Sequence, residues 1–215
     1  MNKVTIVSVV YHEPEWKETK RCVEACGVPV VYVERSPPGV GSLAEAINRG
    51  FRMAPESEFV WFVTNVTFTK DLFEDLLYQM EVCGLAAIHP AFDSDHDHLR
   101  QRMVSASPTL IAPFVEFTAP LIRSSVFEQI QLDEKMPYVG HDMAWSYDVQ
   151  QLGYQVGVYH DHKLGHTYIR HRKGFHPITH RRRMLRRKAV QPTIQRLIER
   201  YGPDYKSKIQ YHNQL

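Results

Sequence analysis

The chain has 215 residues, of which 43% are hydrophobic and 11% aromatic, enough for one packed domain and too many for global disorder. No apolar run approaches the ~18–20 residues of a membrane-spanning helix, and three cysteines without framework spacing indicate reduced thiols in a cytoplasmic protein. Residues 1–162 carry 12 Lys and Arg against 22 Asp and Glu, whereas residues 163–215 carry 14 against 2.

Short apolar runs alternate with helical segments in the first half of the chain. Ser42 and Glu45 have the spacing of a capping box at the start of one helix. Strands that alternate with helices indicate βαβ units and a largely parallel sheet. The predicted strands are 4–10, 28–33, 59–63 and 85–88, and the predicted helices are 13–26, 42–53 and 70–82.

The second half is less regular, and we divide it at residue 168. A domain over 1–168 is predicted to end with a strand at 117–122, helices at 124–130 and 142–152, and a strand at 154–159. Gly153 stands where a helix end is expected. Residues 169–215 form a basic, mainly helical C-terminal extension in this prediction.

Polar residues follow the predicted strands of the first half. The first strand runs into Tyr11, the second ends at Glu34, and the third ends at Thr64 and Asn65. Ligands of open α/β sheets bind outside the carboxyl ends of the strands. A carboxylate such as Glu34 would accept hydrogen bonds from a base or ribose there, although it would equally serve as the first residue of a surface loop.

The order of several short motifs resembles the GT-A glycosyltransferases, in particular the family 2 type. The resemblance covers roughly residues 3–168. It implies an α/β fold of the GT-A, Rossmann-like kind, with a mixed, mainly parallel sheet flanked by helices. It also implies inverting transfer of a sugar from a nucleotide-sugar donor to an acceptor hydroxyl. The matching elements are the opening strand 4–13, Glu34, Asn48 within 46–50, the strand 58–67, the helix and strand 141–156, and His166.

The resemblance assigns Asp142 as the general base, which removes the proton from the acceptor hydroxyl. A carboxylate at a helix start also faces the positive end of the helix dipole, and a plain N-cap role for Asp142 stays open beside the catalytic one. His141 replaces the family's usual acidic partner and would orient Asp142, contact the acceptor or fill space. The residues expected to contact the donor are Tyr11, Glu34, Asn48, Thr64, Asn65, Arg170, Arg172 and Lys173.

The Asp-x-Asp metal motif of the family is missing, and Asn65 stands in place of the metal-binding Asp. An amide oxygen binds a divalent cation without contributing charge, so we expect weaker binding of Mn²⁺ or Mg²⁺ by Asn65 and His166. Two alternatives are open. Residues 93–98 offer three carboxylates and two imidazoles as metal ligands, although they would equally form a solvated acidic loop. Alternatively, the basic extension would neutralise the charge of the diphosphate without a metal.

Residues 170–188 hold nine Lys and Arg and three His, a density typical of contacts to a phosphate backbone. With the resemblance, this favours DNA as a partner and a hydroxymethylated base as the acceptor, as in viral DNA-modifying glycosyltransferases acting in the host-cell cytoplasm. A cell-envelope or other polysaccharide acceptor is the alternative, and so is an extension that folds back to neutralise the acidic body.

Two other functions are weighed against glycosyl transfer. A nucleotidyltransferase usually has a Gly-rich, Lys-containing loop after the first strand, and residues 11–15 read Tyr-His-Glu-Pro-Glu instead. A catalytically inactive, nucleic-acid-binding domain is favoured by the missing Asp-x-Asp and opposed by the retained Asp142 and His166.

Overall fold

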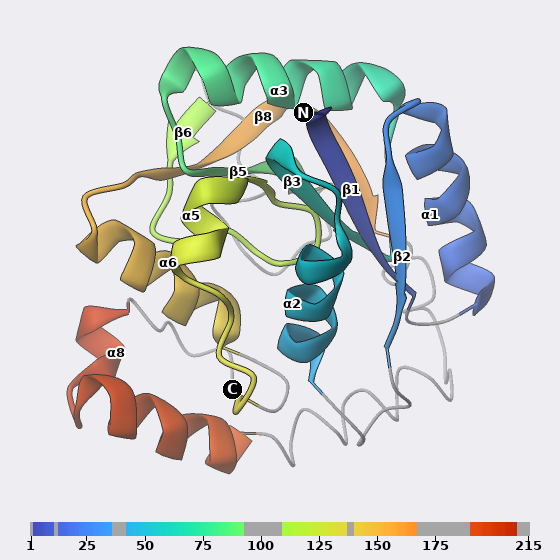
Figure 1. The fold of residues 1–215 in the computed structure, drawn as a ribbon. Helices are drawn as coiled ribbons and strands as arrows, with labels where there is room; N and C mark the ends of the chain where they lie inside the picture. Colours follow the sequence, from blue (N-terminus) through green and yellow to red (C-terminus); the bar gives the residue numbers. More distant parts are fainter. Residues whose placement is uncertain are drawn as a thin grey trace.

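The computed structural model describes residues 2–10, 13–35, 42–92, 109–136, 140–166 and 190–209. A central sheet has the strand order β2-β1-β3-β7-β5-β8-β4, with β6 paired to β8, and helices lie on both of its faces (Figure 1). The long ladders β1–β2, β1–β3 and β5–β8 are parallel, and short antiparallel ladders join them. The strands are β1 Asn2–Val10, β2 Val30–Glu34, β3 Ser57–Thr64, β4 Val66–Thr67, β5 Ala87–Phe92, β6 Thr109–Ile111, β7 Leu121–Arg123 and β8 Val156–His166.

The helices follow the predicted order. α2 begins after Ser42, whose hydroxyl accepts a hydrogen bond from the Glu45 amide at 3.0 Å, which confirms the predicted N-cap. Gly84 ends α3 in the left-handed conformation that glycine adopts without strain. The helices are α1 Glu13–Ala25, α2 Leu43–Met53, α3 Lys70–Cys83, α5 Ser124–Gln129, α6 His141–Gln151 and α8 Tyr205–Lys208, with a further helix over residues 190–201.

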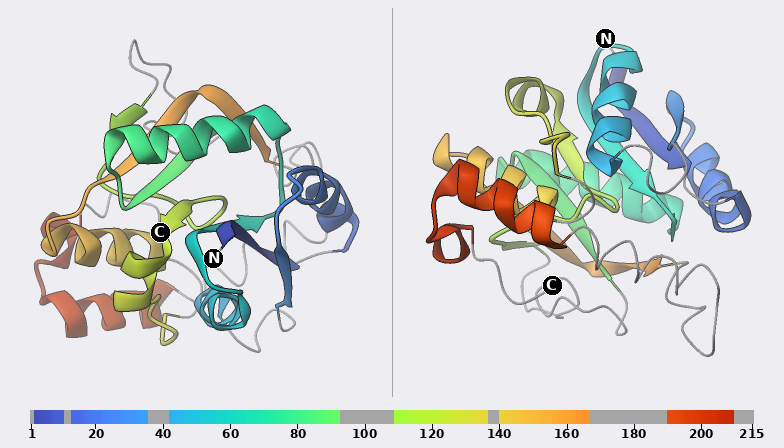
Figure 2. Two further views of the ribbon diagram at one scale, coloured as in Figure 1. Left: turned by 45° about the horizontal axis from the view of Figure 1, so that its top comes forward. Right: turned by 90° about the horizontal axis from the view of Figure 1, so that it is seen from below.

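Alternation along β1 and β3 divides the core into two layers, because successive strand residues point to opposite faces. Ile6 and Trp61 pack under α1 and α3 on one face. Val7 and Phe62 pack under α2, α5 and α6 on the other. All four side chains are fully buried. Both faces of these strands are therefore covered, as expected for a parallel sheet, and Figure 2 shows the helices in two layers.

The described part of the C-terminal extension packs against the domain. Leu197 from the helix over 190–201, and Tyr205 and Ile209 from the α8 region, are buried against Met143 and Ala144 of α6. This packing agrees with the alternative in which the extension folds back onto the acidic body. Residues 169–189 lie outside the described residues, so the DNA-binding prediction for them stays a prediction. Among the described helices, none combines the length and apolar character that spanning a bilayer would require.

One predicted strand has different bounds in the structure. The strand expected at 117–122 is reduced to β7, Leu121–Arg123. Pro120 has no amide hydrogen to donate, which shortens the ladder, although its carbonyl still accepts a hydrogen bond from the Phe62 amide at 3.1 Å. The preceding residues follow β3 in irregular conformation toward its carboxyl end, which brings residues 116–119 to the candidate site.

Candidate active site

The carboxyl ends of β1, β2 and β3 lie level with one another. The ladders pair Val10 with Glu34 and Val9 with Thr64. The Arg35 amide donates a hydrogen bond to the Val10 carbonyl at 3.1 Å, which continues the alignment past the end of β2. We call these three strand ends the carboxyl edge. The predicted positions of Glu34 and Thr64 at this edge are confirmed, and Tyr11 lies outside the described residues.

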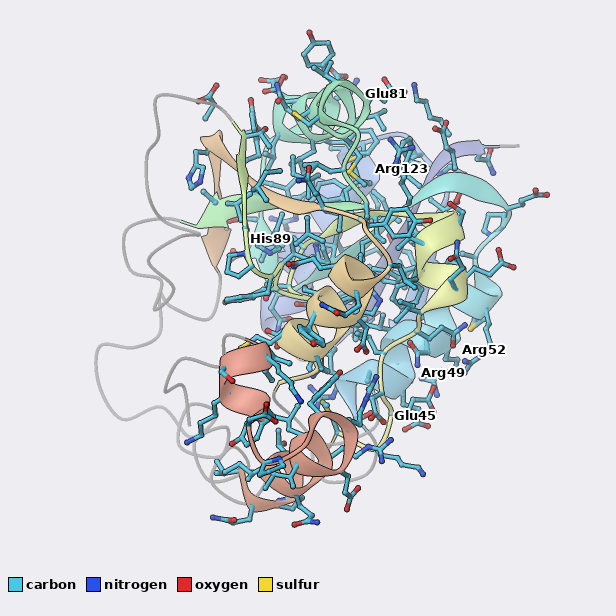
Figure 3. The ribbon with its side chains drawn as sticks, turned by 90° about the vertical axis from the view of Figure 1, so that its left-hand side faces the viewer. Glu45, Arg49, Arg52, Glu81, His89 and Arg123 are labelled. Atoms are coloured by element: carbon cyan, nitrogen blue, oxygen red, sulfur yellow. The ribbon has the colours of Figure 1, made fainter. Side chains whose placement is uncertain are left out.

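Helix α2 holds the edge from one side. The Arg49 guanidinium donates a hydrogen bond to the backbone carbonyl of Glu34, whose own side chain is exposed. Arg49 and Arg52 are labelled on α2 in Figure 3. The backbone of Glu34 is thus fixed, whereas its carboxylate faces solvent, as a ligand-binding carboxylate requires.

Asn48 has a structural role in this structure. Its side chain is 2% exposed, and its amide nitrogen donates to the Leu132 carbonyl and to Glu134 Oε1, both at 2.9 Å. Its Oδ1 accepts a hydrogen bond from the Leu132 amide at 3.1 Å. These bonds use both N–H groups to hold residues 132–134 against α2. Direct contact of Asn48 with the nucleotide-sugar donor is still a prediction, and these hydrogen bonds disfavour it.

Asn65 marks the point where β3 ends and β4 begins. Its φ of 25° is the one positive value at a non-glycine position in the described residues. Asn is among the residues that tolerate this conformation best, and such positions gather at functional sites. The buried Thr19 hydroxyl of α1 donates to the Val66 carbonyl at 2.9 Å, which fixes the turn.

Asn65 and His166, the two predicted metal ligands, belong to neighbouring stretches of backbone. Val66 pairs with His166 and Thr67 with Gly165 in an antiparallel ladder, so the backbone of His166 lies beside the Asn65 turn. The side chain of His166 is outside the described set. Within that set, no three His, Cys, Asp or Glu side chains form a cluster suited to a metal ion.

Glu116 is a polar residue of this region that the sequence reasoning missed. Its side chain is 9% exposed, and its Oε2 accepts a 3.5 Å hydrogen bond from the Thr118 hydroxyl. Thr118 in turn lies opposite the end of β3, because its carbonyl accepts the Thr64 amide at 2.8 Å. The signal in the sequence was a lone carboxylate between apolar residues, Phe114-Val-Glu-Phe117.

Two buried side chains hold the segment that carries Glu116. The Ala119 amide donates to His89 Nε2 at 3.2 Å, and the Ala119 carbonyl accepts the Trp61 indole N–H at 2.9 Å. Because Nε2 accepts, the ring proton of His89 is on Nδ1, which lies 2.6 Å from the Pro90 carbonyl. His89, labelled in Figure 3, therefore has a structural role: it holds the segment that carries Glu116.

Helix α6 begins with the two residues singled out from the sequence. Gly140 is its N-cap, with φ of 86°, so the plain N-cap role for Asp142 is wrong. Asp142 lies in the first turn, half-buried, and its Oδ1 accepts a hydrogen bond from the Met143 amide at 2.9 Å. Asp142 thus lies near the N-terminal end of α6, where the helix dipole is positive.

His141 connects α6 with the carboxyl edge. Its ring is 6.2 Å from that of Phe117, the neighbour of Glu116. Burial lowers the pKa of His141, and the Arg35 charge lowers that pKa further against the opposing effect of Asp142. Arg35 and Asp142 thus both contribute to the electrostatic environment of this imidazole.

The candidate site comprises three carboxylates, an imidazole whose pKa is lowered and an amide oxygen. Asp142 and His141 come from α6, Glu34 and Asn65 from the strand ends, and Glu116 from the segment between β6 and β7. A carboxylate in such a set is suited to removing a proton from a bound ligand. The predicted donor contacts Arg170, Arg172 and Lys173 and the acidic loop 93–98 lie outside the described residues.

Comparison with known proteins shows the fold. No protein-family model matches the sequence, and no curated protein sequence matches it. The structure is similar to that of S. aureus TarS residues 1–349, with a TM-score of 0.52, 14% identity, and coverage of 75% of this chain and 59% of TarS 1–349. It is also similar to GalNAc-T7, solved with UDP, GalNAc and Mn²⁺, with a TM-score of 0.54, 10% identity, and coverage of 77% of this chain and 44% of that one. The chain therefore spans less than two thirds of either protein, and the fold it shares with these glycosyltransferases is the GT-A fold.

Proposed function

We propose that the protein is a nucleotide-sugar-dependent glycosyltransferase. The observation that carries the proposal is the position of Asp142. In a GT-A fold, Asp142 is a half-buried carboxylate in the first turn of α6, and its neighbour His141 lies 6.2 Å, ring to ring, from Phe117 in the segment that is bonded to the end of β3. Ligands of open α/β sheets bind at the carboxyl edge. The similarity to the two glycosyltransferases agrees with this function.

Asp142 is the general base in this proposal. Its carboxylate takes the proton of the acceptor hydroxyl while that oxygen forms a bond to the anomeric carbon. The bond from the anomeric carbon to the diphosphate oxygen breaks, and the nucleoside diphosphate leaves with its electron pair. Attack opposite the leaving group inverts the anomeric configuration. The carboxylate must lie within hydrogen-bond reach of the hydroxyl, and general-base catalysis of this kind contributes roughly 10²–10⁴-fold to the rate.

His141 supports this chemistry by being neutral. Burial and the Arg35 charge lower its pKa below the ordinary value of 6.5, so at neutral pH the imidazole carries no positive charge. An imidazolium next to Asp142 would stabilise the carboxylate and weaken it as a base. The replacement of the family's acidic partner by His141 is compatible with a base at this position.

The oxygen ligands near β3 fit a divalent cation. Asn65 offers an amide oxygen and Glu116 a buried carboxylate, and His166 is the last residue of the adjacent strand β8. Oxygen and imidazole ligands suit Mn²⁺, and oxygen ligands suit Mg²⁺. When bound, the cation would supply positive charge to the diphosphate. Glu116 restores the negative charge that Asn65 lacks, so we include it with Asn65 and His166 as a proposed ligand.

The acceptor is proposed from composition alone. Residues 170–188 favour an anionic polymer, and a hydroxymethylated base in DNA is the acceptor we propose to test first. A polysaccharide acceptor is the second class. No contact of the described residues distinguishes the two.

The test is release of nucleoside diphosphate from a panel of nucleotide sugars with Mn²⁺ or Mg²⁺. Each donor is incubated alone, with hydroxymethylated DNA, with unmodified DNA, and with a polysaccharide mixture. Release that requires hydroxymethylated DNA supports the transferase and its acceptor. Release that requires the polysaccharide supports the transferase and replaces the acceptor. Release of pyrophosphate from nucleoside triphosphates instead would identify a nucleotidyltransferase, and absence of release with every donor would contradict the proposal.

A further inference from the structure

The helix over residues 190–201 carries a network of charges that faces α6. Arg196 Nε lies 2.7 Å from Asp133 Oδ2, and Arg200 Nη1 lies 3.0 Å from the same oxygen. The other terminal nitrogen of Arg200 pairs with Asp148 of α6. Arg200 therefore joins two carboxylates, one from the segment that leads into α6 and one from α6 itself.

The network is set in a partly buried environment. The Asp133 side chain is 8% exposed and the Asp148 side chain 20% exposed, so solvent screens these pairs less than it screens surface pairs. Burial raises the pKa of Asp148 in spite of the nearby Arg200 charge and the Tyr201 hydrogen bond. For Asp133, burial is outweighed by the Arg196 hydrogen bond and by other contacts, and the pKa is lowered. Removal of Arg200 would leave Asp148 half-buried without its cation.

Tyr201 extends the contact along α6. Its hydroxyl lies 3.1 Å from both carboxylate oxygens of Asp148 and 3.4 Å from the Ala144 carbonyl. Its ring meets the Tyr147 ring edge-on at 5.4 Å. Leu197 fills the apolar space beside Met143 and Ala144. These contacts reach the turn of α6 that carries Asp142, because Met143 and Ala144 are the next two residues.

Apolar packing alone would allow α6 to slide or rotate against its neighbour. A guanidinium has donors in a fixed plane, so a pair of carboxylates bound to it has a defined distance and orientation. Residues 132–134 are also bound to α2 through Asn48 and Ser42. Arg200 thus connects α6 to a segment that is already bound to α2. Asp142 and Asp148 are six residues apart, roughly 240° around the helix, so the network holds α6 from a side other than that of Asp142.

We infer that Arg200 is a positioning residue, which sets the location of Asp142 by joining α6 to Asp133 through Asp148. The catalytic part of this inference rests on the proposed function. It also assigns a role to part of the basic extension: the charges of Arg196 and Arg200 are engaged by the domain and do not form a surface for nucleic acid. A displacement of the order of 1 Å at a catalytic group costs about 10²-fold in rate, so a small shift of α6 is sufficient for a large effect.

The first test is hydrogen exchange, because it does not depend on activity. The full chain is compared with Arg200→Met, Arg200→Lys and the control Lys206→Gln, which removes one positive charge from an exposed lysine of α8. In Arg200→Met we expect amides of residues 144–148 to exchange about tenfold faster, with α3 within about twofold of the unchanged protein. Arg200→Lys should be intermediate, since a point charge cannot reproduce the planar contact to both carboxylates. Lys206→Gln should match the unchanged protein.

Equal exchange over 144–148 in Arg200→Met and the unchanged protein would overturn the inference. An equal acceleration in α3 would also overturn it, because the effect would then be global destabilisation. The second readout is turnover: we expect kcat to fall at least about tenfold with the donor KM within about twofold, and Arg200→Lys to recover part of kcat. An unchanged kcat would overturn the catalytic role. If the unchanged protein turns over no donor, the proposed function fails, whereas the exchange result still decides whether Arg200 holds α6.

Discussion

The carboxyl edge and the C-terminal helix over residues 190–201 use polar side chains in opposite ways. At the edge, backbone groups are held by other residues: Arg49 binds the Glu34 carbonyl and Thr19 the Val66 carbonyl. The exposed Glu34 carboxylate lies at the end of a strand whose backbone is already fixed. On the C-terminal helix, the charged groups themselves form the contacts, and Arg196 and Arg200 bind Asp133 and Asp148.

This difference shows that the number of charges in a segment does not predict their availability. The 14 Lys and Arg of residues 163–215 favoured an anionic partner, and packing of the extension against the acidic body was the alternative. Two of these arginines are engaged by carboxylates of the domain. Position in the fold is more informative, because strand ends of an open α/β sheet are the place where side chains remain available to a ligand.

The largest effect is expected at Asp142. Asp142→Asn removes the proposed base but preserves size and helix position, so turnover should fall by about 10²–10⁴, or about 3–5 kcal/mol of activation free energy. The control is Asp71→Asn, since Asp71 is likewise the second residue of a helix and is exposed at the start of α3. Steady-state kinetics and nucleotide affinity should be measured for both. Equal turnover in the two variants would remove Asp142 from the chemistry.

Substitutions in the C-terminal helix should change the stability of the protein and not its chemistry. Leu197 is fully buried against α6, so Leu197→Ala should lower the free energy of unfolding by about 2–5 kcal/mol. Ile198 is the next residue and is 37% exposed, and Ile198→Ala should cost much less. Chemical denaturation measures both. Similar small losses for the two variants would show that the helix is not docked on α6 in solution.

Substitutions of Asn65 and Glu116 test the proposed role of these residues in cation binding. Asn65→Asp adds a negative charge, and Asp also tolerates a positive φ, so the Kd for Mn²⁺ should fall by about tenfold. Glu116→Gln should raise it by a similar factor. Both are measured by calorimetry with the metal alone. Unchanged affinity in both variants would separate this region from the metal.

The smallest effect is expected from His141 and concerns pH. Its pKa in the folded state is below 6.5, so the unfolded chain binds the proton first. The corresponding stability is present above pH 6.5 and is lost as pH falls toward the folded pKa, with a slope of at most about 1.4 kcal/mol per pH unit for one group. His141→Asn should flatten the pH dependence of unfolding between pH 7 and 5. An identical slope in both proteins would contradict burial of a neutral imidazole.

The strands and helices of residues 2–92 were predictable because their signals are local. Short apolar runs predicted β1 and β3, and Ser42 with its spacing to Glu45 predicted the start of α2. The order of such elements predicted a largely parallel sheet, the resemblance to GT-A glycosyltransferases implied the GT-A fold, and the structure confirms both. The shortened β7 was harder to predict, since its limit depends on Pro120 within a ladder formed with a distant strand.

The site was predictable only in part. Glu34, Thr64 and Asn65 stand next to obvious strands, and Asp142 begins an obvious helix. Glu116 and Arg200 gave no comparable signal, because each acquires its position from contacts with residues distant in sequence. Asn48 shows the converse: a recognised motif placed it in the site, whereas its hydrogen bonds to residues 132–134 give it a supporting role.

The most direct measurement is hydrogen exchange of the full chain with and without UDP and Mn²⁺, followed by other nucleoside diphosphates. If the carboxyl edge binds the nucleotide, we expect slower amide exchange at the ends of β1–β3, above all at residues 34–35 and 64–67, and at the start of α6. We expect no change over residues 190–209. Protection confined to residues 190–209, or none with any nucleotide, would contradict a nucleotide-sugar site at the carboxyl edge.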